Sequence, residues 1–143
     1  MNVAIPRQSD LPPLAIVGLF RSRFANKLGI FHKIMPEIEN LESMLAKGQD
    51  HALLRFALGN AFIKFKKYTQ AIDHLAKAVE YDPEYSAAWK LYGIALAEAG
   101  QQGKAASVFE QGIAAAEGKG DMQAVREMRI FLKRLRKNSK YSE

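Results

Sequence analysis

Apolar side chains recur every three or four residues through most of the chain between Pro36 and Lys137. This spacing places them on one face of an α-helix. Short polar breaks interrupt the pattern at Lys66-Lys67-Tyr68-Thr69 and at Gly100-Gln101-Gln102-Gly103. Glycines in the second break supply the positive φ values that end a helix. The pattern therefore predicts an all-α protein built from helices that tight turns connect.

The chain also repeats itself at an offset of 34 residues. Five matched small or large apolar positions carry the repeat: Gly59 with Gly93, Ala71 with Ala105, Leu58 with Tyr92, Phe62 with Leu96, and Leu75 with Phe109. Five matches at one offset are hard to obtain by accident. We therefore expect an antiparallel helix-pair solenoid with two clear repeats, at about residues 52–85 and 86–119.

Two further helices are expected on either side of the repeats. Pro36 is a good first residue for one of them, and Gly48 a good end. Asp121 is a plausible N-cap for the other, a capping helix at 121–137 that covers the last open face of the solenoid. Its apolar stripe consists of Val125, Met128, Leu132 and Leu135. The predicted domain is thus 36–137, with a tail at 138–143.

Residues 1–35 form a basic and apolar N-terminal extension. A shift of 34 positions would make residues 18–31 the first helix of a degenerate preceding repeat, and a disordered segment is the alternative. Such an apolar segment would be prone to aggregation if exposed. We expect it to pack on the body, fill a groove, or bind a partner or a membrane surface.

Membrane insertion and secretion are both disfavoured by the N-terminal pattern. The longest apolar run, Leu14 to Phe20, has seven residues, far fewer than the roughly 18–20 that cross a bilayer. Asp10 precedes this run, and no small-residue cleavage site follows it. We expect a cytoplasmic protein, with an organellar presequence as the alternative that the basic residues leave open.

The amino-acid composition excludes several kinds of metal and catalytic site. The chain has no cysteine, which excludes disulfides, thiolate zinc sites, iron–sulfur clusters and cysteine nucleophiles. His32, His51 and His74 are each isolated from any partner at metal-ligand spacing. The sequence contains no phosphate-cradling glycine loop and no sign of a pocket with paired carboxylates. We predict no metal, no cofactor and no enzymatic activity.

The repeat units resemble the tetratricopeptide repeat. The first carries Leu58-Gly59-Asn60-Ala61-Phe62, then Ala71, Leu75 and Ala78, then Asp82-Pro83. The second carries Trp89-Lys90-Leu91-Tyr92-Gly93, then Leu96, Ala105, Phe109 and Gly112. Arg55 departs from the pattern, because the repeat usually has a large apolar residue there. This departure suggests an unusual neighbour on the N-terminal side of the first unit.

The resemblance implies an interaction module or scaffold that holds a polypeptide on the concave face lined by the first helix of each unit. The residues expected on this face are Leu53, Phe56, Asn60, Ile63, Lys64, Lys90, Ile94, Glu98, Met128 and Phe131. Asn60 would hold the backbone of a peptide, Lys64 or Lys90 an acidic group, and Phe56 and Ile94 would be apolar anchors.

Some members of the family bind acidic C-termini of heat-shock chaperones through a cluster of Lys, Asn and Arg. Only Asn60 fits that cluster here, since Phe56, Leu91, Asp121 and Val125 occupy its other places. That activity is not expected. The alternatives left open are a structural subunit that self-associates through the apolar N-terminus or groove, and a binder of nucleic acid or anionic surfaces.

The distribution of charge bears on whether the protein binds nucleic acid or anionic surfaces. Residues 1–36 and 118–143 carry net charges of +4 and +5, and residues 37–117 carry −3. The basic ends are candidates for acidic partners. The densest run is Arg126, Arg129, Lys133, Arg134, Arg136, Lys137 and Lys140. Complementing the helix dipole explains such a run well. Nucleic acid is not expected, because aromatic residues that stack on bases are missing beside the cations.

Overall fold

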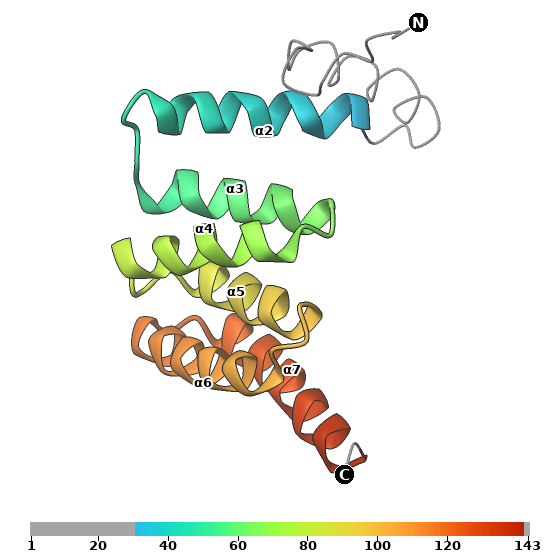
Figure 1. Cartoon of the computed structure of the whole chain (residues 1–143). Helices are drawn as coiled ribbons and strands as arrows, with labels where there is room; N and C mark the ends of the chain where they lie inside the picture. The colour runs from blue at the N-terminus through green and yellow to red at the C-terminus, as the bar shows by residue number, and fades with distance from the viewer. Residues whose placement is uncertain (1–30, 142–143) are drawn as a thin grey trace, which may run out of the picture. The chain divides into compact units, whose positions relative to one another are not determined.

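The computed structural model describes residues 31–141, which form six α-helices without a strand (Figure 1). They are α2 (Phe31–Ala46), α3 (Ala52–Lys64), α4 (Tyr68–Tyr81), α5 (Ser86–Glu98), α6 (Gln102–Lys119) and α7 (Met122–Tyr141). The predicted all-α class and the two helix pairs are confirmed: α3 and α4 form the first repeat, and α5 and α6 form the second. The predictions for residues 1–30 lie outside the described residues.

Two helix ends differ from the prediction. Helix α2 begins at Phe31, so Pro36 lies inside it and not at its start. An interior proline removes one backbone hydrogen bond and crowds the carbonyl four residues before it, so the first turns of α2 form despite Pro36. Helix α7 continues to Tyr141, through part of the segment predicted as a tail. No glycine or proline follows Lys137 to stop it.

The chain divides between Glu39 and Asn40, within α2, and the site described below lies in the second part. In that part α3 packs on α4, α4 on α5, and α5 on α6. Helix α7 covers α6 and also touches α5. This is the capping position that solenoids need, because the last helix pair otherwise leaves its apolar face in water.

The repeated positions form the core. Leu58, Phe62, Leu75, Leu96 and Phe109 are all at most 6 % exposed. Around the second repeat the core is one cluster shared by α5, α6 and α7, made of Leu96, Ala105, Val108, Phe109, Ala116, Ala124, Val125, Met128 and Leu132. The 34-residue match therefore marks the residues that pack between helices.

The matched glycines lie where paired helices cross closely. A Cβ added to Gly59 would lie under 3.0 Å from the side chain of Leu75, and one added to Gly93 would lie equally close to the Phe109 ring. The same pair of contacts recurs 34 residues later in the chain. A side chain at either glycine would push the two helices apart.

Helix ends follow local rules. Asp121 is the N-cap of α7, as predicted, and its Oδ1 accepts a hydrogen bond of 3.1 Å from the backbone N–H of Ala124. Gly100 and Gly120 follow α5 and α6 with φ values of +82° and +81°. These left-handed residues end the two helices in the manner typical of glycine.

Candidate polypeptide-binding groove

An open groove of about 460 Å³ lies between α5 and α7. Its lining residues are Lys90, Leu91 and Ile94 from α5, and Glu127, Ile130, Phe131 and Arg134 from α7. Four of the seven are apolar. We call it the α5–α7 groove.

The floor of the groove is held rigidly by the core. Ile94 and Phe131 both pack against the buried cluster of the second repeat. The Phe131 ring also stacks on Phe109 of α6, with ring centroids 5.6 Å apart and planes inclined by 5°. Ile130, in contrast, is 52 % exposed. Exposed apolar surface beside a fixed floor is typical of a site that binds a partner.

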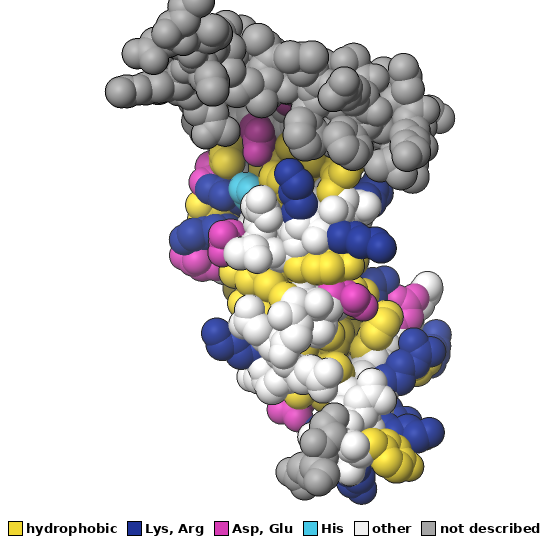
Figure 2. All heavy atoms as spheres, turned by 45° about the vertical axis from the view of Figure 1, so that its right-hand side comes forward, with side chains coloured by type: hydrophobic (Ala, Val, Ile, Leu, Met, Phe, Trp, Pro, Cys, Tyr) yellow, Lys and Arg dark blue, Asp and Glu magenta, His cyan; other side chains and the backbone are white. Residues whose placement is uncertain are grey.

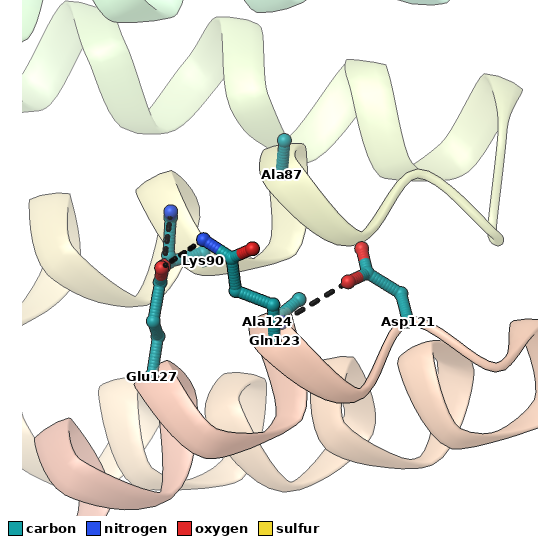
Figure 3. A pocket seen from close by; sticks show the side chains of 6 residues that line it. All are labelled: Ala87, Lys90, Asp121, Gln123, Ala124 and Glu127. Atoms are coloured by element: carbon teal, nitrogen blue, oxygen red, sulfur yellow. Dashed lines mark hydrogen bonds and ion pairs between the residues drawn. The ribbon is translucent and has the colours of Figure 1, made fainter.

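One end of the groove carries an ion pair across the two helices. Lys90 Nζ donates a hydrogen bond to Glu127 Oε2, and Gln123 Nε2 donates to Glu127 Oε1 at 3.2 Å (Figure 3). The hydrogen bond from Lys90, followed by that from Gln123, lowers the pKa of Glu127. Lys90 was expected to receive an acidic group of a ligand, but its charge is already balanced by Glu127.

Arg134 is the cation that remains available in the groove. Its guanidinium carbon lies 5.9 Å from the centre of the Phe131 ring, a cation–π contact. Two other α7 cations are paired with acidic residues of α6: Arg129 with Glu117, and Arg136 with Glu110. Within the part of the chain that the structure describes, Arg134 has no carboxylate partner.

A second hollow of about 290 Å³ adjoins the first, because Phe131 and Arg134 line both. Its other lining residues are Ala97, Glu98, Gln102, Phe109, Leu135 and Asn138. The predicted residue Glu98, at the end of α5, therefore lines the second hollow together with Arg134. Together the two hollows run along the junction of α5 and α7.

Four of the ten predicted site residues line these hollows: Lys90, Ile94, Glu98 and Phe131. Met128 does not, since it is fully buried and its sulfur packs against the position of Gly112. The sequence placed Met128 both in the apolar stripe of the capping helix and on the concave face, and the structure buries it in the core with the rest of that stripe. The correction removes Met128 from any contact with a partner.

The predicted residues on α3 do not line the α5–α7 groove. Phe56 packs on Tyr85, with ring centroids 4.8 Å apart, and on the buried cluster around Ala78. Leu53 and Lys64 are exposed, whereas Asn60 and Ile63 are half-buried.

The sequence analysis missed Leu91, Glu127, Ile130 and Arg134 as groove residues. Helical spacing could have identified two of them, because Ile130 and Arg134 are four positions apart and share a helix face with the predicted Phe131. Arg134 was counted instead as a member of the dense run of cations at 126–140. Only the packing of α7 on α5 distinguishes a cation of the groove from one on the outer surface.

A smaller hollow of about 210 Å³ lies beside the ion pair and is shown in Figure 3. Its polar residues already have partners within the protein. Besides the pair just described, Asp121 accepts from Ala124 N–H and from the Ser86 hydroxyl, and both bonds lower the pKa of the Asp121 carboxyl. We assign this hollow to the junction of α5 with the start of α7.

Arg55 has polar partners in place of the expected apolar contacts. Its Nε and Nη2 donate to the two carboxylate oxygens of Asp50, both at 2.7 Å, and its Nη1 lies 3.1 Å from His74 Nδ1. Tyr81 donates its hydroxyl to Asp50 at 2.9 Å. The hydrogen bond from Arg55 is the main cause that lowers the pKa of Asp50 to about 2. Arg55 is thus bound by Asp50, just before α3, and an unusual neighbour on the N-terminal side of the first repeat stays a prediction.

Within residues 31–141, no group of three His, Cys, Asp or Glu side chains is placed to hold a metal ion. None of the described helices has both the length and the apolar character needed to cross a membrane.

Stacked helix pairs with an open groove along their first helices define a class of repeat proteins that bind other polypeptides. Residues 56–119 match the tetratricopeptide repeat family model. A TPR repeat-containing protein of Pseudomonas aeruginosa is 50 % identical over 98 residues, which cover 68 % of this chain and 93 % of the relative. The chain belongs to the tetratricopeptide repeat family.

Solved structures agree with this assignment. A protein of Bordetella parapertussis, solved in solution, matches with a TM-score of 0.63 and 42 % identity, over 71 % of this chain and 88 % of that one. A crystal structure of MamA matches with a TM-score of 0.54 over 90 % of this chain and 87 % of that one. At 22 % identity, MamA supports the fold alone. Tetratricopeptide repeats generally serve as non-catalytic modules of protein–protein interaction.

Proposed function

We propose that this protein binds a short segment of a partner polypeptide in the α5–α7 groove. The observation that carries the proposal is the combination, in one open groove, of a fixed apolar floor with Arg134, an arginine that has no carboxylate partner among the described residues. Apolar anchors supply affinity in such grooves, and a single cation orients the ligand. The volume of about 460 Å³ also falls within the range of roughly 300–1,000 Å³ typical of ligand sites.

The groove also specifies the chemistry of the segment. An apolar side chain would lie on Ile94, Ile130 and Phe131, and a carboxylate would lie next to Arg134. Arginine binds carboxylates with two parallel hydrogen bonds, which fixes the orientation of the acid. Glu98 and Glu127 lie along the same junction and would repel a second acidic group placed near them. The preferred ligand is therefore an apolar residue followed or preceded by one acid.

A displayed library of random peptides tests the proposal. We expect selection by the full chain to enrich an apolar residue beside Asp or Glu. For a selected peptide, Arg134→Glu should weaken binding at least tenfold, measured by fluorescence polarisation. Lys104→Glu is the matched control, since Lys104 is an exposed lysine on α6 that lines neither hollow. The proposal that peptides bind in the α5–α7 groove would be refuted if Arg134→Glu and Ile130→Asp both bound the selected peptides as tightly as the original chain.

The mass of the chain in solution should be measured alongside over a range of concentration. A monomer leaves the groove free for a partner, as we propose. A mass that rises with concentration, and falls back with Ile130→Asp, would instead assign the groove to self-association. The cytoplasmic location stays a prediction from the sequence.

A further inference from the structure

The seven cations of α7 differ in what they contact. Two pair with acidic residues of α6, and Arg134 lies in the groove. The remaining four make no ion pair with the rest of residues 31–141, and all are exposed: Arg126, Lys133, Lys137 and Lys140. The one acidic residue of α7, Glu127, is held by Lys90. This part of α7 therefore presents positive charge that the rest of residues 31–141 does not neutralise.

These four cations share one face with three apolar side chains. At 3.6 residues per turn, they lie with Met122, Ile130 and Tyr141 inside an arc of roughly 100°, over a length of about 28 Å. Met122, Ile130 and Tyr141 are 48 %, 52 % and 79 % exposed. We call these seven residues the basic face of α7. Figure 2 shows Lys and Arg side chains gathered at the C-terminal end of the molecule, with apolar side chains among them.

The helix dipole explains only part of this face. Cations in the last turn stabilise a helix, which accounts for Lys140. Arg126 is in the second turn, nearer the positive end of the dipole, where a cation gains nothing. Lys133 and Lys137 are also four positions apart, and like charges at this spacing destabilise a helix. A bound polyanion would remove this repulsion.

A hollow also lies among the cations of this face, and most of its surface is apolar. A shallow depression of about 360 Å³ is lined by Lys133, Arg136, Lys137, Lys140 and Tyr141. Lysine ammonium groups are strong donors to phosphate oxygens, and a tyrosine places its ring at an apolar boundary with its hydroxyl in the polar layer.

We propose that the basic face of α7 docks on an anionic phospholipid bilayer, with the cations at the headgroups and Met122, Ile130 and Tyr141 in the interfacial layer. Lipid headgroups and nucleic acids both offer phosphates. The three exposed apolar side chains favour the bilayer, because a nucleic-acid backbone would leave them in water. Tyr141 is also the sole aromatic side chain of this face, whereas single strands bind on several stacked rings. The opposite face of α7 is buried in the core, which keeps the basic face turned outward.

Co-sedimentation of the full chain with vesicles tests the proposal. We expect binding to vesicles of phosphatidylcholine with 30 mol % phosphatidylglycerol, weakening steeply with salt, and much weaker binding to phosphatidylcholine alone. The triple variant Lys133→Gln, Lys137→Gln, Lys140→Gln should lower the partition coefficient about 100-fold, since each cation near an anionic surface contributes roughly fivefold. Because these side chains are exposed, circular dichroism should show unchanged folding.

The matched control removes the same charge elsewhere. Lys47→Gln, Lys67→Gln, Lys104→Gln changes three exposed lysines outside α7. The proposal predicts a much smaller loss for this control than for the α7 triple variant. Equal losses would overturn it, because net charge alone would then account for binding. Absence of vesicle binding by the original chain would overturn it too.

A contribution of exposed apolar side chains to binding distinguishes a bilayer from nucleic acid as the ligand of the basic face. Met122→Ser should weaken vesicle binding several-fold, whereas Met44→Ser, at an exposed methionine of α2, should leave it unchanged. A 20-base-pair duplex should not displace the chain from vesicles at equal phosphate concentration. Displacement by the duplex, together with no effect of Met122→Ser, would assign the basic face to nucleic acid and refute the bilayer.

Discussion

The two repeats of this protein share one backbone arrangement but differ at one equivalent position. Arg55 occupies this position in the first repeat, and Trp89 occupies it in the second, 34 residues later. In the second repeat Trp89 packs on Tyr92 and against Gly112, and its Nε1 donates to the Pro83 carbonyl at 2.8 Å. In the first repeat Arg55 binds Asp50 and His74. The same site is thus filled by an apolar ring in one repeat and by a polar network in the other.

The turns inside the repeats differ in a similar way. Lys66 and Gly100 are equivalent, and both have positive φ, +58° and +82°. Only glycine adopts this conformation without a steric cost. The comparison teaches that the backbone of the repeat is imposed by helix packing, since a residue that disfavours the conformation still adopts it. The side chains then adapt to what surrounds each repeat.

The largest expected effect comes from truncating the equivalent core residues Phe109 and Leu75. We expect Phe109→Ala to reduce the free energy of unfolding by about 3–5 kcal/mol and Leu75→Ala by about 2–5 kcal/mol, because each leaves a cavity. Urea denaturation followed by circular dichroism measures both. A larger loss at Leu75 than at Phe109 would show that the first repeat, and not the second, carries more of the stability.

Glycine substitutions test the close helix crossings. Gly93→Ala should reduce the free energy of unfolding by about 1–3 kcal/mol, because its Cβ would overlap the Phe109 ring. Gly118→Ala is the control: Gly118 lies inside α6, and a Cβ there has no neighbour within 4 Å. Alanine should increase stability at that position by up to about 1 kcal/mol. Equal changes in the free energy of unfolding for Gly93→Ala and Gly118→Ala, in the same urea experiment, would contradict a close crossing of α5 and α6 at Gly93.

The turn comparison yields a smaller effect. Lys66→Gly should increase the free energy of unfolding by up to about 1 kcal/mol, since the relief of left-handed strain exceeds the entropy cost of glycine. Gly100→Ala should reduce it by about 1 kcal/mol, because its φ of +82° disfavours any side chain. Changes of the same sign in thermal unfolding would show that the two turns are not equivalent.

The smallest effect is a pH dependence confined to the first repeat. Burial, and then the nearby charge of Arg55, lower the pKa of His74 below 6.5, the ordinary value for histidine. The folded state therefore disfavours protonated His74, so stability is complete above pH 6.5 and falls as pH decreases through the folded pKa. Urea unfolding at pH 7 and pH 5 should show this loss. His74→Gln, which cannot titrate, should show a smaller one.

Further acidification tests Asp50. Its pKa is about 2 in the folded protein, against an ordinary value of 3.8 for aspartate. The stability from its pairing with Arg55 is present above pH 3.8 and is lost as pH falls towards 2. Arg55→Gln should return the pKa of Asp50 towards 3.8, measured by NMR titration of the carboxyl carbon. An unchanged pKa would contradict the proposed network.

Much of the fold could be predicted from local pattern. The offset of 34 identified both helix pairs, Gly100 marked the end of α5 and Asp121 the start of α7, because these features depend on neighbours in sequence. The start of α2 and the end of α7 were predicted wrongly. The groove was predicted less well. Of the residues predicted to bind a partner, Lys90, Ile94, Glu98 and Phe131 line the two hollows, whereas Met128 is buried and Phe56 packs on Tyr85.

The sequence by itself determined the helix-pair repeat, its core residues and the capping helix, since periodicity and small residues act through short-range geometry. Only the tertiary structure decided which charged groups are available. Lys90 is neutralised by Glu127 across 37 positions of sequence, and Arg136 by Glu110 across 26. Arg134 lies in the groove, and Lys133 lies on the basic face. The angle at which α7 packs on α5 and α6 sets these differences, and no local pattern encodes that angle.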